Sequence, residues 1–401
     1  MCDQVALLNH IAQSCDGKPV VLLIDELNML AVHGRTVELE DDVRQFLKMH
    51  FLDPAGRYLV YSSHIPLEVD GFVTVKGSGR FAVSVPQPLS RDLVALRKMS
   101  EKCEDMTPSE VAYYGGIPSL LYCYKQGALN AQERADGVMD EMRSVDKKII
   151  AAGFVRSLLS GDALTTPLKP LYWLASLDKS KVGKTVVRWP ICYIHHVCHK
   201  VGLLAGVSVF AKTVEHNIAI GYSGLDWQAM VDMALLLRCL DAQLNGSPMM
   251  FDLCDADECT KVSRKKLSYD CDSLKGAREE LVKLASNTEV PTLLHVIPVH
   301  NGFTMFDGFL CYCNKGKIVR NVAYQSKVSK AKKSLKKVPD WIDLAVMIKG
   351  KAAKSPRKSK VNKWMVLSKQ EVLDLLGCSL SPFYPAYWNA TDITIAKAKS
   401  E

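Results

Sequence analysis

The stretch FDGFLCYCNKGKIVRNVAYQSK, residues 306–327, decides how the second half of this chain is expected to fold. An aromatic, alternating run is followed by turn-forming residues at 314–317 and by a second alternating run, a pattern that predicts a β-hairpin. Asp307 opens the first strand, and Gln325 and Lys327 close the second on one face. Antiparallel pairing would bring an acid, an amide and an ammonium together, which suits a divalent metal held against a phosphate. The alternative is an amphipathic hairpin with ordinary polar surface residues.

Length and composition indicate an ordinary globular protein. A chain of 401 residues is expected to form two domains, and its contents of 48% hydrophobic and 23% charged residues are typical of that class. No apolar run reaches the roughly 18 residues of a membrane span, and the N-terminus resembles an amphipathic helix rather than a signal peptide. The 13 cysteines are odd in number and scattered through apolar segments, which predicts free thiols rather than a disulfide framework.

Positive charge is concentrated in residues 315–363. This segment holds 16 Lys or Arg and two acids, so it carries +14 while the whole chain carries +8. Such segregation predicts a polyanionic partner, with nucleic acid first, although a solvated loop would also produce it. The nuclease resemblance given below narrows this expectation to double-stranded DNA. The sequence does not indicate an oligomeric state. The candidate DNA-binding residues are Lys315, Lys317, Arg320, Lys330, Lys332, Lys333, Lys336 and Lys337.

The first half contains KPVVLLID at 18–25, a continuous apolar run that predicts a buried parallel strand. Its end, Asp25 followed by Glu26, matches the Walker B pattern, in which the first acid binds Mg²⁺ and the second orients a water. Buried strands that end in acids for other reasons are the alternative. No Walker A phosphate loop precedes it, and DKSKVGKT at 178–185 follows it in the chain and begins with Asp178. ATP binding is therefore not expected.

The order of motifs after this strand resembles the AAA+/STAND class of P-loop NTPases. A second predicted strand, RYLVYSS at 57–63, ends in small polar residues, and Gly-Gly-x-Pro at 115–118 precedes a helix. By this resemblance, Ser63 and His64 are candidates for sensing a γ-phosphate, and Arg80 is a candidate phosphate-facing arginine. The expectation is a partial NTPase domain that lacks Walker A.

Residues 131–202 are expected to form a mainly helical lid and connector. Within them, Cys192, His195 or His196, and His199 fall at helical spacing. Zinc could bind such a set, but the spacing matches no familiar finger, and a helix with hydrogen-bonded histidines is the alternative.

Residues 203–390 show the pattern of a second α/β domain. The predicted elements are an amphipathic helix at 223–243, buried strands at 249–253 and 293–299, the hairpin, a strand at 341–348 and a helix capped by Ser368. This order resembles the restriction-endonuclease-like PD-(D/E)xK fold.

That resemblance implies roles for four residues. Asp307 and Gln325 would bind Mg²⁺, and Lys327 would position the attacking water or stabilise the transition state. Gln228 occupies the place where many such enzymes have a glutamate on the first helix. An amide binds Mg²⁺ more weakly than a carboxylate, so an impaired nuclease is an alternative.

Together the motifs resemble the Crinkler effectors, which share an NTPase–nuclease architecture with the trypanosomatid retrotransposon hot spot proteins. The motifs are VVLLIDELN (20–28), YLVYSSH (58–64), GGIPSLL (115–121), SGLDWQ (223–228), FDGF (306–309) and AYQSK (323–327). The resemblance implies secretion into a host cell and Mg²⁺-dependent cleavage of host nuclear DNA, with host nuclear proteins as further partners. The family's header and signal peptide are not found in these residues, so a fragment or a non-secreted paralogue is also expected.

The sequence thus predicts an α/β chain of three parts. These are a P-loop NTPase remnant at 1–130, the lid and connector at 131–202, and a restriction-endonuclease-like nuclease at 203–390 that includes the basic segment. The alternatives are a DNA- or chromatin-binding effector without catalysis and a STAND-type ATP switch.

Overall fold

The structure, a computed structural model, describes residues 13, 18–24, 45–52, 56–61, 131–179, 185–203, 224–255, 257–268, 273–299, 306–327, 337–350, 357–359 and 363–381. The chain divides into two compact units, residues 1–87 and 88–401. Helices and a mixed sheet occur together, which confirms the α/β class. Among the described helices, none combines the length and the apolar character that a membrane span requires.

In the first unit, β1 (Val20–Ile24) pairs in parallel with β2 (Arg57–Tyr61). A turn of π-helix, Lys48–Leu52, precedes β2, and the Arg57 guanidinium donates to the carbonyl oxygen of His50 over 2.8 Å. The predicted strands are thus confirmed. The prediction that they are buried is wrong for one face, because four of its apolar side chains are exposed: Val21 (51%), Leu23 (73%), Tyr58 (54%) and Val60 (52%).

The second unit begins with a mainly helical segment. Its elements are α8 (Ala131–Glu141), α9 (Lys147–Ser160), a 3₁₀ segment (Thr166–Leu174), the antiparallel strands β3 (Ser176–Lys179) and β4 (Thr185–Arg188), and α10 (Ile191–Lys200). The Asp146 side chain caps the start of α9, and Gly161 ends it at a φ of 73°. Phe154 of α9 packs edge-on against Trp189, with ring centroids 4.6 Å apart.

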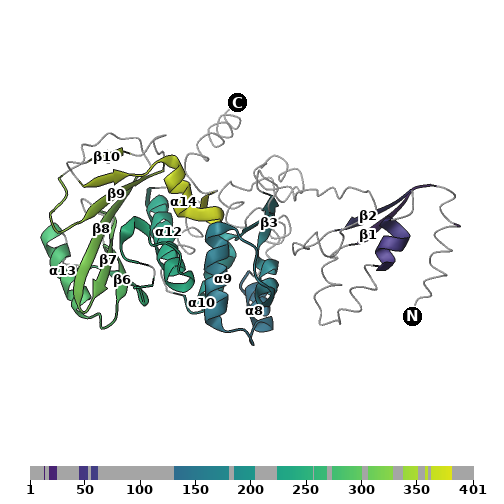
Figure 1. Ribbon diagram of the computed structural model, residues 1–401, viewed down its shortest axis with the longest axis horizontal. Helices are drawn as coiled ribbons and strands as arrows, with labels where there is room; N and C mark the ends of the chain where they lie inside the picture. The colour runs from purple at the N-terminus through teal and green to yellow at the C-terminus, as the bar shows by residue number, and fades with distance from the viewer. Residues whose placement is uncertain are drawn as a thin grey trace, which may run out of the picture. The chain divides into compact units, whose positions relative to one another are not determined.

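A seven-stranded mixed sheet follows, in the order β10-β11-β9-β8-β7-β6-β5 (Figure 1). Its strands are β5 (Lys261–Lys266), β6 (Thr292–Ile297), β7 (Gly308–Asn314), β8 (Lys317–Lys327), β9 (Leu344–Lys349), β10 (Arg357–Ser359) and β11 (Trp364–Val366). Strands β6, β7 and β8 form an antiparallel meander, whereas β9 runs parallel to β8, and β11 runs parallel to β9.

The predicted hairpin is confirmed as β7 and β8. Lys315 and Gly316 form its two-residue turn, with φ values of 48° and 72°. Two consecutive positive φ values are those of a type I′ turn, whose twist matches that of the strands. A bulge at Tyr312 and Cys313 shifts the register near the turn.

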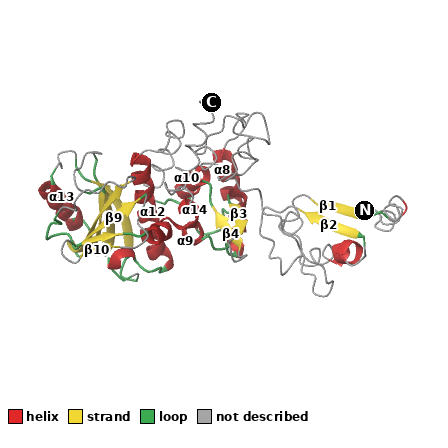
Figure 2. Cartoon of the chain, turned by 90° about the horizontal axis from the view of Figure 1, so that it is seen from above, coloured by secondary structure: helices red, strands yellow, loops and turns green. Residues whose placement is uncertain are grey.

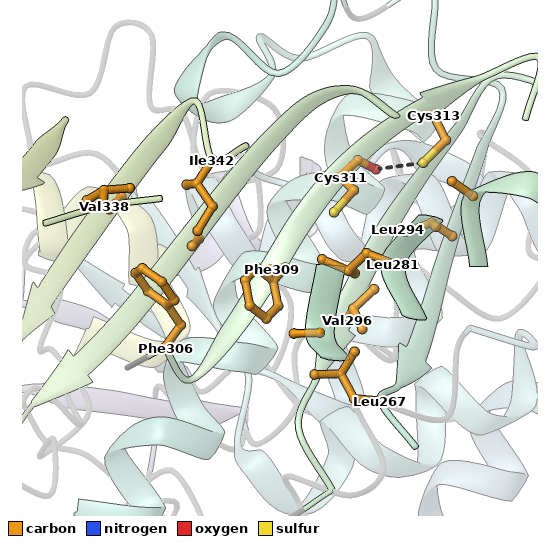
Figure 3. Packing of buried hydrophobic residues seen from close by; sticks show 14 of the residues in the cluster. Leu267, Leu281, Leu294, Val296, Phe306, Phe309, Cys311, Cys313, Val338 and Ile342 are labelled. Carbon is orange, nitrogen blue, oxygen red and sulfur yellow. Dashed lines mark hydrogen bonds between the residues drawn. The ribbon is translucent and has the colours of Figure 1, made fainter. Parts of the chain in front are cut away.

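Two helices cover opposite faces of the sheet (Figures 1 and 2). Helix α13 (Leu274–Ser286) packs over a core that includes Phe309, Ala323 and Ala345 (Figure 3). Helix α12 (Gly224–Asn245) covers the other face, where the indole of Trp227 donates to the carbonyl oxygen of Ile348 over 3.4 Å. Because side chains alternate along a strand, Tyr324 and Ser326 of β8 belong to the α12 face.

Helix α14 (Lys369–Leu380) joins the sheet to the helical segment. Ser368 and Glu371 form a capping box at its start, as expected for a helix capped by Ser368. At its far end, the Ser379 hydroxyl accepts a hydrogen bond of 3.1 Å from the backbone of Trp189. The helices at 131–200 therefore pack against the sheet-bearing part within the second unit.

One predicted strand, at 249–253, is wrong. Residues Met250–Asp252 form a 3₁₀ turn instead, in which Phe251 and Asp252 adopt φ values of 60° and 49°. These left-handed conformations are incompatible with an extended strand. The next strand along the chain is β5, which begins at Lys261.

Candidate functional site

Asp307 lies immediately before β7, beside the last residues of β8. Its backbone N–H donates to the carbonyl oxygen of Tyr324 over 2.8 Å. Its Oδ2 atom accepts hydrogen bonds from both the backbone N–H and the hydroxyl of Ser326, the latter over 2.7 Å. Both bonds go to one oxygen, which leaves Oδ1 for another ligand. Ser326, the residue between Gln325 and Lys327, therefore orients the Asp307 carboxylate.

Gln325 and Lys327 alternate onto the face opposite Tyr324 and Ser326. Gln325 pairs with Met347, and Lys327 pairs with Lys349 at the ends of the parallel strands β8 and β9. Burial raises the pKa of Asp307, and the charge of Lys327 opposes this shift after the two hydrogen bonds from Ser326. The hydrogen-bond partner of the Asp307 carboxylate in the described part of the chain is thus Ser326, rather than Gln325 or Lys327.

A second carboxylate approaches from α12. Gln228 is half-buried on this helix, and Asp232 follows it by four residues, which places both on one side of the helix. Asp232 is 7% exposed, and its burial raises its pKa, with a smaller contribution in the same direction from the negative charge of Asp307. The acid that α12 contributes near Asp307 is therefore Asp232, whereas the sequence had pointed to the Gln228 position.

Asp232 belongs to a buried hydrogen-bonded network. The hydroxyl of Tyr324 donates to Oδ1 of Asp232 over 2.7 Å and lies 2.7 Å from Nε2 of His295 on β6. Since the single hydroxyl proton goes to Asp232, the Tyr324 oxygen accepts the proton of His295 Nε2. His295 Nδ1 then carries the lone pair, and it has no hydrogen-bond partner within the described ranges.

Gly308 leaves the space that the Tyr324 side chain needs to reach His295. Tyr324 reaches from β8 toward His295 on β6, and β7 lies between these strands. Gly308 is paired with Tyr324, and a Cβ atom at this position would collide with the tyrosine hydroxyl. The glycine of the FDGF motif is therefore required by a close side-chain approach, while its own φ is not in the left-handed region.

The electrostatics of the network follow from burial. Burial raises the pKa of Asp232 to about 7, although the hydrogen bond from Tyr324 and the charge of Arg264 oppose this shift. Burial also lowers the pKa of His295 to about 3, and the cross-strand neighbour Arg264 acts in the same direction. Burial likewise raises the pKa of Asp307 against the opposing effects of Ser326 and Lys327. Both carboxylates would thus be stabilised by an added cation.

The described residues contain no group of three or more His, Cys, Asp or Glu side chains that could hold a metal ion. This gives the predicted set of Cys192 and neighbouring histidines no support as a zinc site. Mg²⁺ differs, because one or two protein carboxylates commonly hold it together with waters and substrate phosphates. Asp307 and Asp232 are two carboxylates that would serve as such ligands, and the Asp307 charge acts on Asp232.

Four of the predicted DNA-binding residues lie in the described part of the chain. Lys315 and Lys317 are exposed at the hairpin turn, and 11-residue β8 separates Lys317 from Lys327 by roughly 30 Å. Arg320 is half-buried on the same strand, and Lys337 is exposed. Lys327, which pairs with Lys349, is the residue of this strand whose charge acts on Asp307.

Several predicted positions lie outside the described residues. They are Asp25, Glu26, Ser63, His64 and Arg80 in the first unit and Lys330, Lys332, Lys333 and Lys336 in the second. Their predicted roles stay predictions.

The sequence contains a signal for the network that is independent of any family resemblance. Asp232 interrupts the apolar run MVDMALLL, and His295 interrupts TLLHVI. A polar residue in the middle of an apolar element is buried and needs a partner, so the two interruptions indicate a polar contact inside the fold.

Comparisons of the chain with protein-family models, with curated proteins and with solved structures found no match. The geometry around Asp307 and Asp232 is therefore the basis on which a function can be assigned.

Proposed function

We propose that residues 224–381 form a divalent-metal-dependent nuclease domain of the restriction-endonuclease-like type, which hydrolyses phosphodiester bonds in DNA. The observation that carries this proposal is that Tyr324 and Ser326, on one face of β8, hydrogen-bond two desolvated carboxylates, Asp232 and Asp307. A bound cation would offset the cost of ionising both buried carboxyl groups, so the pair favours a cation-binding role.

Each residue of the site has a role in this proposal. Asp307 and Asp232 would hold Mg²⁺, which when bound supplies Lewis-acid polarisation of the phosphate and a more acidic water. Ser326 fixes the orientation of Asp307, and Tyr324 with His295 fixes that of Asp232. The Lys327 ammonium would stabilise negative charge that develops on the phosphate.

The order of elements supports this assignment. Helix α12, the antiparallel meander β6–β7–β8 and the parallel strand β9 follow the order expected from the restriction-endonuclease-like resemblance. Lys327 and Lys349, neighbours at the carboxyl ends of β8 and β9, provide positive charge for the DNA backbone. By the same resemblance, host nuclear DNA is the target, and residues 1–130 are a degenerate P-loop NTPase without ATP binding.

Cleavage of supercoiled plasmid in Mg²⁺ or Mn²⁺ tests the proposal. We expect Asp307→Asn and Asp232→Asn to reduce nicking by about 100-fold or more, since even outer-shell partners of metal sites contribute about 10- to 100-fold. The matched control is Asp340→Asn, which removes an exposed acid from the same unit and should nick at the unaltered rate. Equal nicking by the unaltered chain and Asp307→Asn would contradict the proposal. DNA binding without metal-dependent nicking would favour the non-catalytic alternative.

A further inference from the structure

Strand β5 is the outermost strand on one side of the seven-stranded sheet, and it is strongly basic. Its sequence, KVSRKK, contains four cations and no acid. Val262 points into the fold and is buried, whereas Lys261, Lys265 and Lys266 are exposed. The salt bridges between described residues involve none of these three lysines. Their charge is therefore available to an anionic partner.

The carboxyl end of β5 lies at the same end of the sheet as Asp307. Strand β5 runs parallel to β6, and the antiparallel pairs β6–β7 and β7–β8 make β6 and β8 run in the same direction. Strand β9 is parallel to β8. The carboxyl ends of β5, β6, β8 and β9 therefore lie beside the amino end of β7, which Asp307 precedes.

The register of the strands places Lys266 close to the level of Asp307. Lys265 lies in line with Phe309, because both residues pair with Val296 of β6. One residue nearer to this end of the sheet, Lys266 therefore lies in line with the residue that follows Asp307. Adjacent strands are about 4.8 Å apart, so the backbones of β5 and β7 are separated by about 10 Å.

Two further lysines lie on the other side of Asp307. Lys327 and Lys349 are paired at the carboxyl ends of β8 and β9. Four strand spacings separate β5 from β9, which amounts to about 19 Å. The proposed metal site thus lies between two groups of lysines at one end of the sheet.

The positive charge of β5 also acts on the second carboxylate of the site. Arg264, which precedes Lys265, is the cross-strand neighbour of His295. Burial raises the pKa of Asp232, and the charge of Arg264 opposes this shift after the hydrogen bond from Tyr324. Strand β5 is therefore near enough to the site for its cations to contact the same anionic ligand.

We propose that Lys265 and Lys266 bind phosphates of the DNA backbone on the β5 side of the Asp307 site, while Lys327 and Lys349 bind phosphates on the β9 side. This inference rests on the proposed function, and it adds the path of the DNA across the strand ends. Each strand of a duplex carries one phosphate per roughly 3.4 Å of helix axis, so a distance of about 19 Å spans about six phosphates. The two groups of lysines can therefore bind one duplex at different phosphates, without reading its sequence.

The double variant Lys265→Gln, Lys266→Gln tests this path. Fluorescence anisotropy with a labelled duplex in EDTA, at a series of salt concentrations, measures binding without cleavage. We expect the slope of log affinity against log salt to become shallower by about 1.8, since each lost phosphate contact contributes about 0.9. The matched control is Lys261→Gln, at the amino end of the same strand and about 16 Å from Lys266, which should leave the slope unchanged.

A second variant separates the loss of charge from a loss of folding. Lys265→Arg with Lys266→Arg keeps both positive charges and should keep the slope of the unaltered chain. An unchanged slope in the glutamine double variant would overturn the inference. The same conclusion would follow if Lys261→Gln or the arginine double variant lowered the slope equally, or if the unaltered chain bound the duplex without any dependence on salt.

The failure of this inference can be distinguished from the failure of the proposed function. If Asp307→Asn abolishes nicking while the glutamine double variant keeps its slope, the nuclease is retained and only this DNA path is rejected. If Asp307→Asn nicks as fast as the unaltered chain while the glutamine double variant has the shallower slope, the nuclease is rejected and the phosphate-binding site on β5 is retained.

Discussion

The hydroxyl of Tyr324 lies 2.7 Å both from Oδ1 of Asp232 and from Nε2 of His295. It links the central strand β8 to helix α12 on one side and to β6 on the other. Tyr324 and Asp232 are 92 residues apart in the chain, so the bond joins elements that are distant in sequence. The second carboxylate of the proposed metal site is thus fixed by a tyrosine rather than by its own helix.

Tyr324→Phe should destabilise the second unit. The variant leaves the shape of the ring unchanged but removes a partner from both Asp232 and His295, each of which is buried. The expected loss in free energy of unfolding is about 1–3 kcal/mol, the cost of unsatisfied buried polar groups. Urea denaturation provides the measurement. Tyr58→Phe, at an exposed tyrosine, is the control and should change stability by less than about 0.5 kcal/mol. Matching midpoints for the two variants would contradict the network.

Asp232 and His295 should give opposite dependences of stability on pH. Burial raises the pKa of Asp232 from 3.8 to about 7, so the folded chain keeps a proton that the unfolded chain releases, and this stabilisation is lost as pH rises toward 7. Burial lowers the pKa of His295 from 6.5 to about 3, so below 6.5 the unfolded chain gains a proton that the folded chain does not, and stability is lost as pH falls.

Single substitutions separate these two contributions. Relative to the unaltered chain, the free energy of unfolding of Asp232→Asn should rise with pH between about 4 and 7, whereas that of His295→Gln should fall between about 3 and 6.5. Urea unfolding in buffers with EDTA measures both without bound metal. Parallel pH profiles for the two variants would show that at least one group is not buried as described.

Gly308→Ala should destabilise the fold for a steric reason. The added Cβ would displace the Tyr324 hydroxyl and so break both of its hydrogen bonds. Overpacking a core typically costs about 1–3 kcal/mol in free energy of unfolding. Gly137→Ala in α8 is the matched control, because nothing lies within 4 Å of its Cβ, and it should stabilise by up to about 1 kcal/mol. A neutral Gly308→Ala would contradict the close approach.

Lys327→Gln and Lys349→Gln should each lower the affinity for DNA and make that affinity less sensitive to salt concentration. For duplex DNA, the slope of log affinity against log salt becomes shallower by about 0.9 for each phosphate that the protein no longer neutralises. Fluorescence anisotropy with a labelled duplex in EDTA gives this slope without cleavage. Lys275→Gln on α13 is the control, since its exposed side chain pairs with Glu279 on the same helix, and the slope should stay constant. A slope that is unchanged in the double lysine variant would place the DNA elsewhere.

The sequence predicted the elements whose signals are local. The hairpin was recognisable because alternation and turn residues lie within 306–327, and the start of α14 because Ser368 and Glu371 form a capping box. Strand β5 was missed, since KVSRKK has one apolar residue and no alternation to detect. The basic composition of that strand reflects its position at the edge of the sheet, which depends on the whole topology.

The site was predictable only in part, because its contacts join distant segments. Asp307 and Lys327 were brought together by the hairpin, whose pairing can be read from the sequence. Asp232 cannot be identified as a site residue from the sequence, since its role depends on how α12 lies across the sheet relative to Tyr324. A helical pattern identifies a buried face but not the strand residue that each position meets.

Both edges of the sheet are cationic, and this affects how the chain behaves at high concentration. The outermost strands are β5, with sequence KVSRKK, and β10, with the three-residue sequence RKS. An unpaired edge with a flat apolar surface would recruit strands from other molecules, whereas short strands and lysines resist such pairing. The positive charge on these strands should therefore keep an apolar sheet from growing into an aggregate.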